Sequence, residues 1–205
     1  MPLARPRRAG TLLLLGALWA ASAGGQGGAV ITGRVRVDVA DLADVLVYVR
    51  SGLPARAKYQ APAAPVAIEL RGCRLRPRVV PVMAGQALEL RNLDSLPHRI
   101  GAAAARNRGF DVTLAPGERT RRYLATPEIP VGLRCDAHAE AAAYVAVLAH
   151  PFYALTGTDG RYSLRGLPAG TYSIEAWHHR YGTRAATLTV TGAGAQTHDF
   201  RFAAP

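Results

Sequence analysis

The sequence is poor in lysine, cysteine and methionine. Lys58 is the only lysine, and the 205 residues include two cysteines and two methionines. Arginine therefore carries nearly all the positive charge behind a formal net charge of +11. The arginines are scattered and have no aromatic platform among them, so the charge gives no reason to expect a nucleic-acid partner.

Long apolar runs are also scarce. One stands out, TLLLLGALWAA, which follows the basic MPLARPRR and precedes an A-x-A cleavage site at Ala21-Ser22-Ala23. This order is typical of a secretory signal peptide, so we expect residues 1–23 to be removed and the mature protein to be periplasmic or secreted. No later run reaches the roughly 20 residues that a membrane-spanning helix needs, and we expect no stable membrane insertion.

Signatures of common enzymes are missing as well. The sequence has no nucleophile elbow, no HExxH and no phosphate-binding loop. Acidic residues are few and isolated, so a catalytic carboxylate pair of the glycosidase type is not apparent. We therefore expect the protein not to be an enzyme.

The remaining pattern is that of an all-β protein. Residues 29–37 (AVITGRVRV) alternate as a half-buried strand does, and residues 45–49 (VLVYV) form a second β-rich run. Residues 51–65 carry three prolines and no periodicity, which indicates a linker or long loop. Many short apolar runs with turn signals between them follow from residue 66, which favours β-sandwiches.

The C-terminal segment raises a question of domain organisation. It is β throughout, with an Asp159-Gly160 hairpin turn, but residues 152–203 alone are thin for a two-sheet sandwich. We expect the missing strands to come from the N-terminus. This predicts a discontinuous sandwich, residues 29–50 plus 150–203, with a second sandwich, residues 66–149, inserted between its parts.

Three residues within the inserted part form a candidate metal site. Cys135 precedes His138 by three positions, and His98 lies upstream in the turn-rich NLDSLPHRI. One thiolate and two imidazoles are the ligand set of a blue-copper centre. Because side chains alternate faces along a strand, Cys135 and His138 can converge on one ion only if a tight loop begins at Asp136.

Other residues bear on this site. Asn92 and Asp94 are turn-formers, and we expect them to support the loop that carries His98 without binding the ion directly. A Cys73–Cys135 disulfide is the alternative, since an oxidising compartment permits it and it would consume the thiolate. The other four histidines offer no clear ligand set.

Two stretches carry a resemblance to known families. CRLRPRVVPVMAGQALELRNLDSLPH and GLRCDAHAEA resemble the plastocyanin-like pattern of a cupredoxin, and ITGRV, VLVYV and TDGRYSLRGLPAGTYSIEAW resemble the transthyretin-like, carboxypeptidase regulatory-like domain. The whole chain is similar to exported bacterial proteins that combine both, also called methylamine-utilisation-like. The resemblance implies a cupredoxin-like Greek key inserted in a carboxypeptidase regulatory-like sandwich. It implies an axial methionine at position 141 and an asparagine at position 99, where this chain has Ala141 and Arg99.

Two functions from different classes follow. The first is a periplasmic cupredoxin-like protein that binds one copper ion at His98, Cys135 and His138 and carries one electron to or from a redox partner, or holds copper. The alternative is a metal-free β-sandwich interaction module with a degenerate copper site, which binds a carbohydrate or a protein. The sequence predicts no oligomeric state.

Overall fold

The protein is built from strands alone. A computed structural model describes residues 28–204 except Val39, and all regular structure in this part of the chain is β. The all-β class predicted from the sequence is therefore confirmed. The predicted signal peptide, residues 1–23, lies outside the described residues. No helix in the described part is long and apolar enough to cross a membrane.

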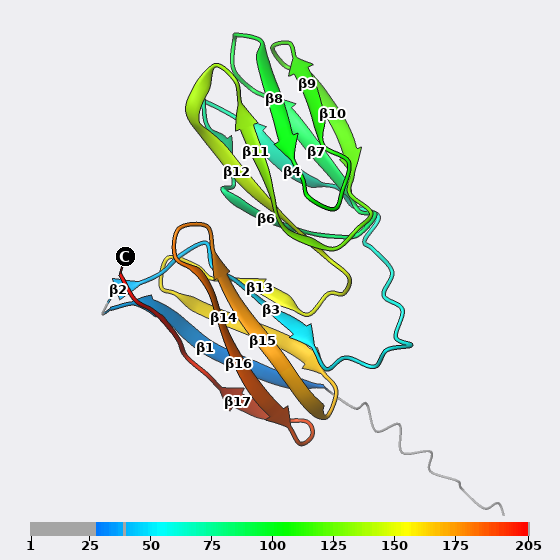
Figure 1. Cartoon of the computed structure of the whole chain (residues 1–205), viewed down its shortest axis with the longest axis vertical. Helices are drawn as coiled ribbons and strands as arrows, with labels where there is room; N and C mark the ends of the chain where they lie inside the picture. Colours follow the sequence, from blue (N-terminus) through cyan, green and yellow to red (C-terminus); the bar gives the residue numbers. More distant parts are fainter. Residues whose placement is uncertain (1–27, 39, 205) are drawn as a thin grey trace, which may run out of the picture.

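The strands form four sheets that pair into two sandwiches, one above the other in Figure 1. The lower sandwich has one sheet with β1 between β14 and β17, to which β2 and β18 also pair, and a second sheet in the order β13-β3-β15-β16. Its strands are β1 (Ala29–Val37), β2 (Ala40–Asp41), β3 (Leu46–Ser51), β13 (Tyr153–Leu155), β14 (Arg161–Leu167), β15 (Gly170–His178), β16 (Gly182–Val190), β17 (Ala195–Thr197) and β18 (Phe200–Phe202).

The upper sandwich is made from the middle of the chain. Its sheets have the orders β10-β7-β4-β5 and β6-β12-β11-β8-β9. The strands are β4 (Val66–Leu70), β5 (Leu75–Arg76), β6 (Val79–Met83), β7 (Ala87–Asn92), β8 (His98–Ala103), β9 (Phe110–Leu114), β10 (Arg119–Tyr123), β11 (Glu128–Cys135) and β12 (His138–Leu148).

Each sandwich has its own apolar core. Alternate residues of the facing strands point inward, as the period of two requires. The upper core includes Ile68, Leu90 and Leu133, and the lower core includes Ile31 and Ile174, all at most 1% exposed. The predicted strand at residues 29–37 coincides with β1, and its inward positions fill the lower core.

A third apolar cluster joins the two sandwiches. It contains Leu46, Tyr48, Val79, Ala146, Leu148 and Trp177, which come from β3, β6, β12 and β15. The odd-numbered residues of β12 from Ala141 to Val147 face the upper core, while Ala146 and Leu148 face this junction. Strand β3 divides its faces in the same way. Burial on both faces explains why VLVYV and YVAVL read as continuous apolar runs instead of alternating.

The strand pairings connect the two ends of the chain. Strand β1 pairs antiparallel with β14, and β3 pairs antiparallel with β15. Residues 52–65 contain no strand and carry the chain from the lower sandwich to β4 (Figure 1). These pairings are the ones that a discontinuous lower unit requires, and the predicted boundaries of the two domains stay a prediction.

A fragment of residues 150–204 should fail to fold. It lacks β1 and β3, which lie inside the two sheets of the lower sandwich and not at their edges. Far-UV circular dichroism and amide proton dispersion should show a disordered chain, with residues 24–204 as the folded control. Cooperative thermal unfolding of the isolated fragment would contradict the discontinuous unit.

Candidate metal centre

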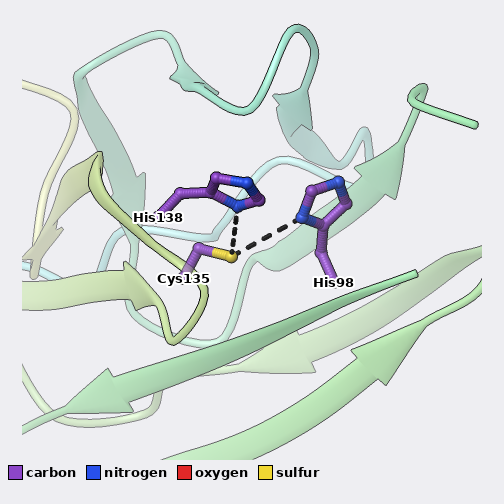
Figure 2. A group of neighbouring side chains, drawn as sticks. All are labelled: His98, Cys135 and His138. Carbon is purple, nitrogen blue, oxygen red and sulfur yellow. Dashed lines mark hydrogen bonds between the residues drawn. The ribbon is translucent and has the colours of Figure 1, made fainter. Parts of the chain in front are cut away.

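Three side chains from the ends of strands β8, β11 and β12 converge at one end of the upper sandwich. Sγ of Cys135 lies 3.6 Å from Nδ1 of His98 and 3.6 Å from Nδ1 of His138. Figure 2 shows the two imidazoles next to each other, with a nitrogen of each ring turned toward the sulfur. The ring centroids are 5.1 Å apart, and the three ligand atoms lie within 4.8 Å of one another.

These separations fit a shared ion. With bonds of about 2.3 Å to sulfur and about 2.0–2.1 Å to nitrogen, bond angles of about 110–120° put the sulfur and each nitrogen about 3.6–3.8 Å apart. The observed 3.6 Å falls in this range for both histidines. The three donors therefore need little rearrangement to meet on one metal.

A two-residue turn brings Cys135 and His138 together. Strand β11 ends at Cys135 and β12 begins at His138, and these two residues pair across a register shift. The backbone N–H of Asp136 donates to the carbonyl of Arg99 on β8, at 3.1 Å. The tight loop that the sequence required at Asp136 is present, and it is anchored to the strand that carries His98.

A buried asparagine holds the loop before His98. Asn92 is fully buried, and its Nδ2 donates to the carbonyls of Leu96, Leu114 and Ala115 at 2.8, 3.0 and 3.2 Å. Its Oδ1 accepts the backbone N–H of Asp94 at 3.0 Å. The amide has two N–H hydrogens, so one of them is shared between two of these carbonyls, whereas a carboxylate could only accept; the residue type is therefore tied to the turn.

Asp94 links that loop to a neighbouring turn. Its carboxylate accepts the backbone N–H groups of Gly72 and Cys73 at 2.6 and 2.9 Å. The bond from Cys73 lowers the pKa of Asp94 most; partial desolvation opposes it, and the bond from Gly72 and the proximity of His98 lower the pKa further. Asp94 is therefore a carboxylate at neutral pH, placed beside the second nitrogen of a site histidine.

The contact between Asp94 and His98 is close but is not a hydrogen bond. Oδ2 of Asp94 lies 3.3 Å from Nε2 of His98. The His98 side chain is only 1% exposed, and Nε2 has no hydrogen-bond partner because the alignment is poor. A buried imidazole nitrogen without a partner is uncommon and calls for a reason.

Arg99 does not point at the site. It follows the buried His98 on β8 and therefore lies on the opposite face, where its side chain is 57% exposed. Its guanidinium lies 3.5 Å from a carboxylate oxygen of Asp111 and 3.3 Å from one of Asp136. These two carboxylates offset the positive charge of Arg99 beside the site.

Ala141 lies on the same face of the sheet as Cys135. It is fully buried and belongs to the upper core together with Cys135. Its methyl group is not a metal ligand. At the position where the resemblance implies methionine, the chain therefore has a buried apolar side chain with no ligand atom.

Both cysteines are free. Sγ of Cys135 faces His98 and His138, whereas Cys73 lies with Asp94 and His98 in a second group whose ligand atoms are within 4.8 Å of one another. The sequence analysis considered Cys73 only as a disulfide partner. The hydrogen bonds from the backbone of residues 72 and 73 to Asp94 hold Cys73 near His98. No spacing in the sequence signals these bonds.

Two further histidines adjoin one another at the end of β15. The rings of His178 and His179 have centroids 4.2 Å apart, because the strand ends at His178 and the alternation of faces ends with it. Burial, and then the neighbouring His179, Arg180 and Arg78, lower the pKa of His178 to about 4. Within the described residues, neither histidine joins a group of three potential metal ligands.

Comparison with protein families supports one of the resemblances directly. Residues 136–203 match the family described as carboxypeptidase regulatory-like domain. The family-level resemblance inferred from the sequence is confirmed for this segment. The match begins in the turn before β12 of the upper sandwich and omits β1 and β3, which the structure pairs with the matched strands. A comparison with curated protein sequences gives no significant match.

Solved structures similar to the chain include copper proteins. A Cu-containing nitrite reductase from Thermus scotoductus SA-01 is 21% identical over 47% of this chain, with a TM-score of 0.38, and only 25% of that enzyme is covered. A purple cupredoxin from Nitrosopumilus maritimus is 18% identical over 40% of this chain and 97% of its own, with a TM-score of 0.35. An amicyanin mutant in the Cu(I) state is 12% identical over 49% and 97%, with a TM-score of 0.38.

The protein should contain two free thiols. The sulfur of Cys135 is directed at two imidazoles, and Cys73 lies beside Asp94, so neither requires a disulfide. Alkylation under denaturing, non-reducing conditions should modify Cys73 and Cys135, as measured by mass spectrometry of the intact protein. An unalkylated product two hydrogens lighter would establish a disulfide and remove the thiolate from the site.

Proposed function

We propose that this protein is an exported copper-binding protein of the cupredoxin-like type, which carries one electron or holds copper. The observation that carries the proposal is the equal 3.6 Å separation of the Cys135 sulfur from Nδ1 of His98 and of His138. A soft thiolate with two imidazoles in a trigonal arrangement is the donor set that suits copper.

The group of His98, Cys135 and His138 lacks the fourth protein ligand of a structural zinc site. Structural zinc is usually bound by four protein ligands in a tetrahedron. Here three donors come together, and the buried Ala141 lies on the core side of the sheet with no ligand atom to add. Three strong ligands with a weak or absent axial bond are tolerated by copper in electron-transfer sites.

The protein would contribute a preorganised ligand frame. Asn92 fixes the loop before His98, and the 3.1 Å bond from Asp136 to Arg99 fixes the loop between Cys135 and His138. Bound copper would supply the exchange of one electron between its two common oxidation states. Because both loops are anchored to β8 or to its neighbours, the ligands would move little between those states.

Exposure suggests where a partner would approach. Cys135 and His98 are buried, whereas His138 is partly exposed and is followed by the exposed Ala139 and Glu140. A redox partner would therefore reach the site through the His138 edge. If copper is held and not cycled, the same edge would be the route for its loading and release.

Export is part of the proposal. The residues that predict it, 1–23, precede the described part of the chain, and an oxidising, copper-containing compartment suits the site. The carboxypeptidase regulatory-like match supports an architecture in which a second sandwich carries the copper unit. In true carboxypeptidases this regulatory domain lacks catalytic residues, so the match implies no peptidase, and we infer a role without catalysis.

One equivalent of Cu(II) should give the reduced, mature protein an intense sulfur-to-copper charge-transfer band in the visible. The band requires the Cys135 thiolate, so Cys135→Ser should abolish it. Cys73→Ser is the matched control and should keep the band. Protein with two free thiols that binds no copper, or shows no such band, would instead support the metal-free interaction module.

Replacement of Ala141 by methionine should tighten Cu binding or shift its potential. A thioether at this buried position would add the weak axial bond that the chain lacks. Copper affinity, the visible spectrum and the redox potential measure the effect. Ala143→Met adds the same volume to the same face of β12 and should leave all three unchanged. Equal behaviour of the two variants would show that position 141 does not face the ion.

A further inference from the structure

We propose a second cation site, formed by Cys73, Asp94 and Nε2 of His98, which shares the His98 imidazole with the first site. One ligand atom from each of these residues lies within 4.8 Å of the others. A thiolate, a carboxylate and an imidazole are the three ligand types that zinc uses in proteins. The inference goes beyond the proposed copper function and does not depend on it.

The unpartnered nitrogen of His98 is the observation that points to a ligand. Nε2 is buried and makes no hydrogen bond, although Oδ2 of Asp94 is 3.3 Å away. Two ligand atoms bound to one tetrahedral zinc at about 2.0–2.1 Å lie about 3.3–3.4 Å apart. The contact has the length expected between two ligands of one ion, and it lacks the alignment of a hydrogen bond.

The carboxylate is fixed in position for this role. Oδ1 of Asp94 accepts the N–H of Gly72, and Oδ2 accepts that of Cys73, so both carboxylate oxygens are fixed by the backbone. Oδ2 keeps a second lone pair that can bind a cation. A cation would complete its bonding and that of Nε2 together.

Cys73 supplies the third donor from the same turn. Residues 71 and 74 hydrogen-bond to each other through their backbones, and Cys73 between them is only partly buried. Its sulfur lies within 4.8 Å of the other two ligand atoms, and a common zinc ion requires about 3.6 Å between a sulfur and a nitrogen or oxygen ligand. Three protein ligands would leave a fourth position for water or another donor.

Cobalt(II) in the Cys135→Ser variant provides a direct test. The chain has only two cysteines, so in this variant any sulfur-to-cobalt charge-transfer band must come from Cys73. The variant also lacks the thiolate of the proposed copper site, which keeps the two proposals separate. We expect one equivalent of Co(II) to produce the band with tetrahedral ligand-field absorption, and Zn(II) to displace it.

Variants then assign the remaining ligands. Asp94→Asn and His98→Gln, each in the Cys135→Ser background, should weaken zinc binding by more than about tenfold, the loss that can follow even when an outer-shell partner of a metal is removed. Removal of Cys73 as well should abolish the charge-transfer band. His138→Gln is the matched control, because His138 belongs only to the first site, and it should change zinc affinity little.

Two results would overturn the second site. One is the absence of a charge-transfer band in the folded Cys135→Ser protein. The other is a band unaffected by Asp94→Asn and His98→Gln, which would mean that an isolated thiol binds the metal adventitiously. If circular dichroism shows His98→Gln to be unfolded, Asp94→Asn and the ligand-field bands decide, since octahedral absorption would exclude the proposed set.

Discussion

Strand β12 is the constraint on which the rest of the structure depends. One face of this strand fills the upper core through Ala141, Ala143, Val145 and Val147, and the other packs against the lower sandwich through Ala146 and Leu148. At its first residue it presents His138 to the candidate metal site. A strand buried on both sides has little freedom to slip, because a shift by one residue would exchange its two faces. The position of the ligand loop is thus tied to the packing of both sandwiches.

The site depends in turn on buried polar contacts and not on apolar packing alone. Asn92 closes the turn before His98, and Asp94 connects this turn to residues 72 and 73. Replacing this amide leaves the buried carbonyl of Leu114 without its donor, and a lost buried partner costs about 1–3 kcal/mol. These contacts explain how the loop before His98 holds this side chain close to Cys135.

His98 sits between two sets of potential ligands. Its Nδ1 faces Cys135, and its Nε2 faces Asp94. In many metal sites the second nitrogen of a ligand histidine donates to a carboxylate, which fixes the ring. Here the alignment for that bond is poor, and a second cysteine lies close by. Asp94 can therefore either orient His98 for the first site or join Cys73 and His98 as a ligand of the second. Whether Cys73 binds a metal decides between these two roles.

Much of this protein was determined by local sequence. Period-two alternation predicted β1, and short apolar runs between turn signals predicted strands in the upper sandwich. The spacing of Cys135 and His138 required the tight turn that the structure contains. His98, Cys135 and His138 were identified as one ligand set from residue type and order, because those features follow from short-range chemistry.

Only the tertiary structure decided the contacts between distant segments. Strand pairing joins β1 and β3 to the C-terminal strands, and a side chain from the 92–98 turn brings Cys73 to His98. Likewise, the outward direction of Arg99 and its two carboxylate partners depend on which face of β8 is buried. Local patterns do not encode such features, since they arise from loops closing over many residues and from the packing of one sheet upon another.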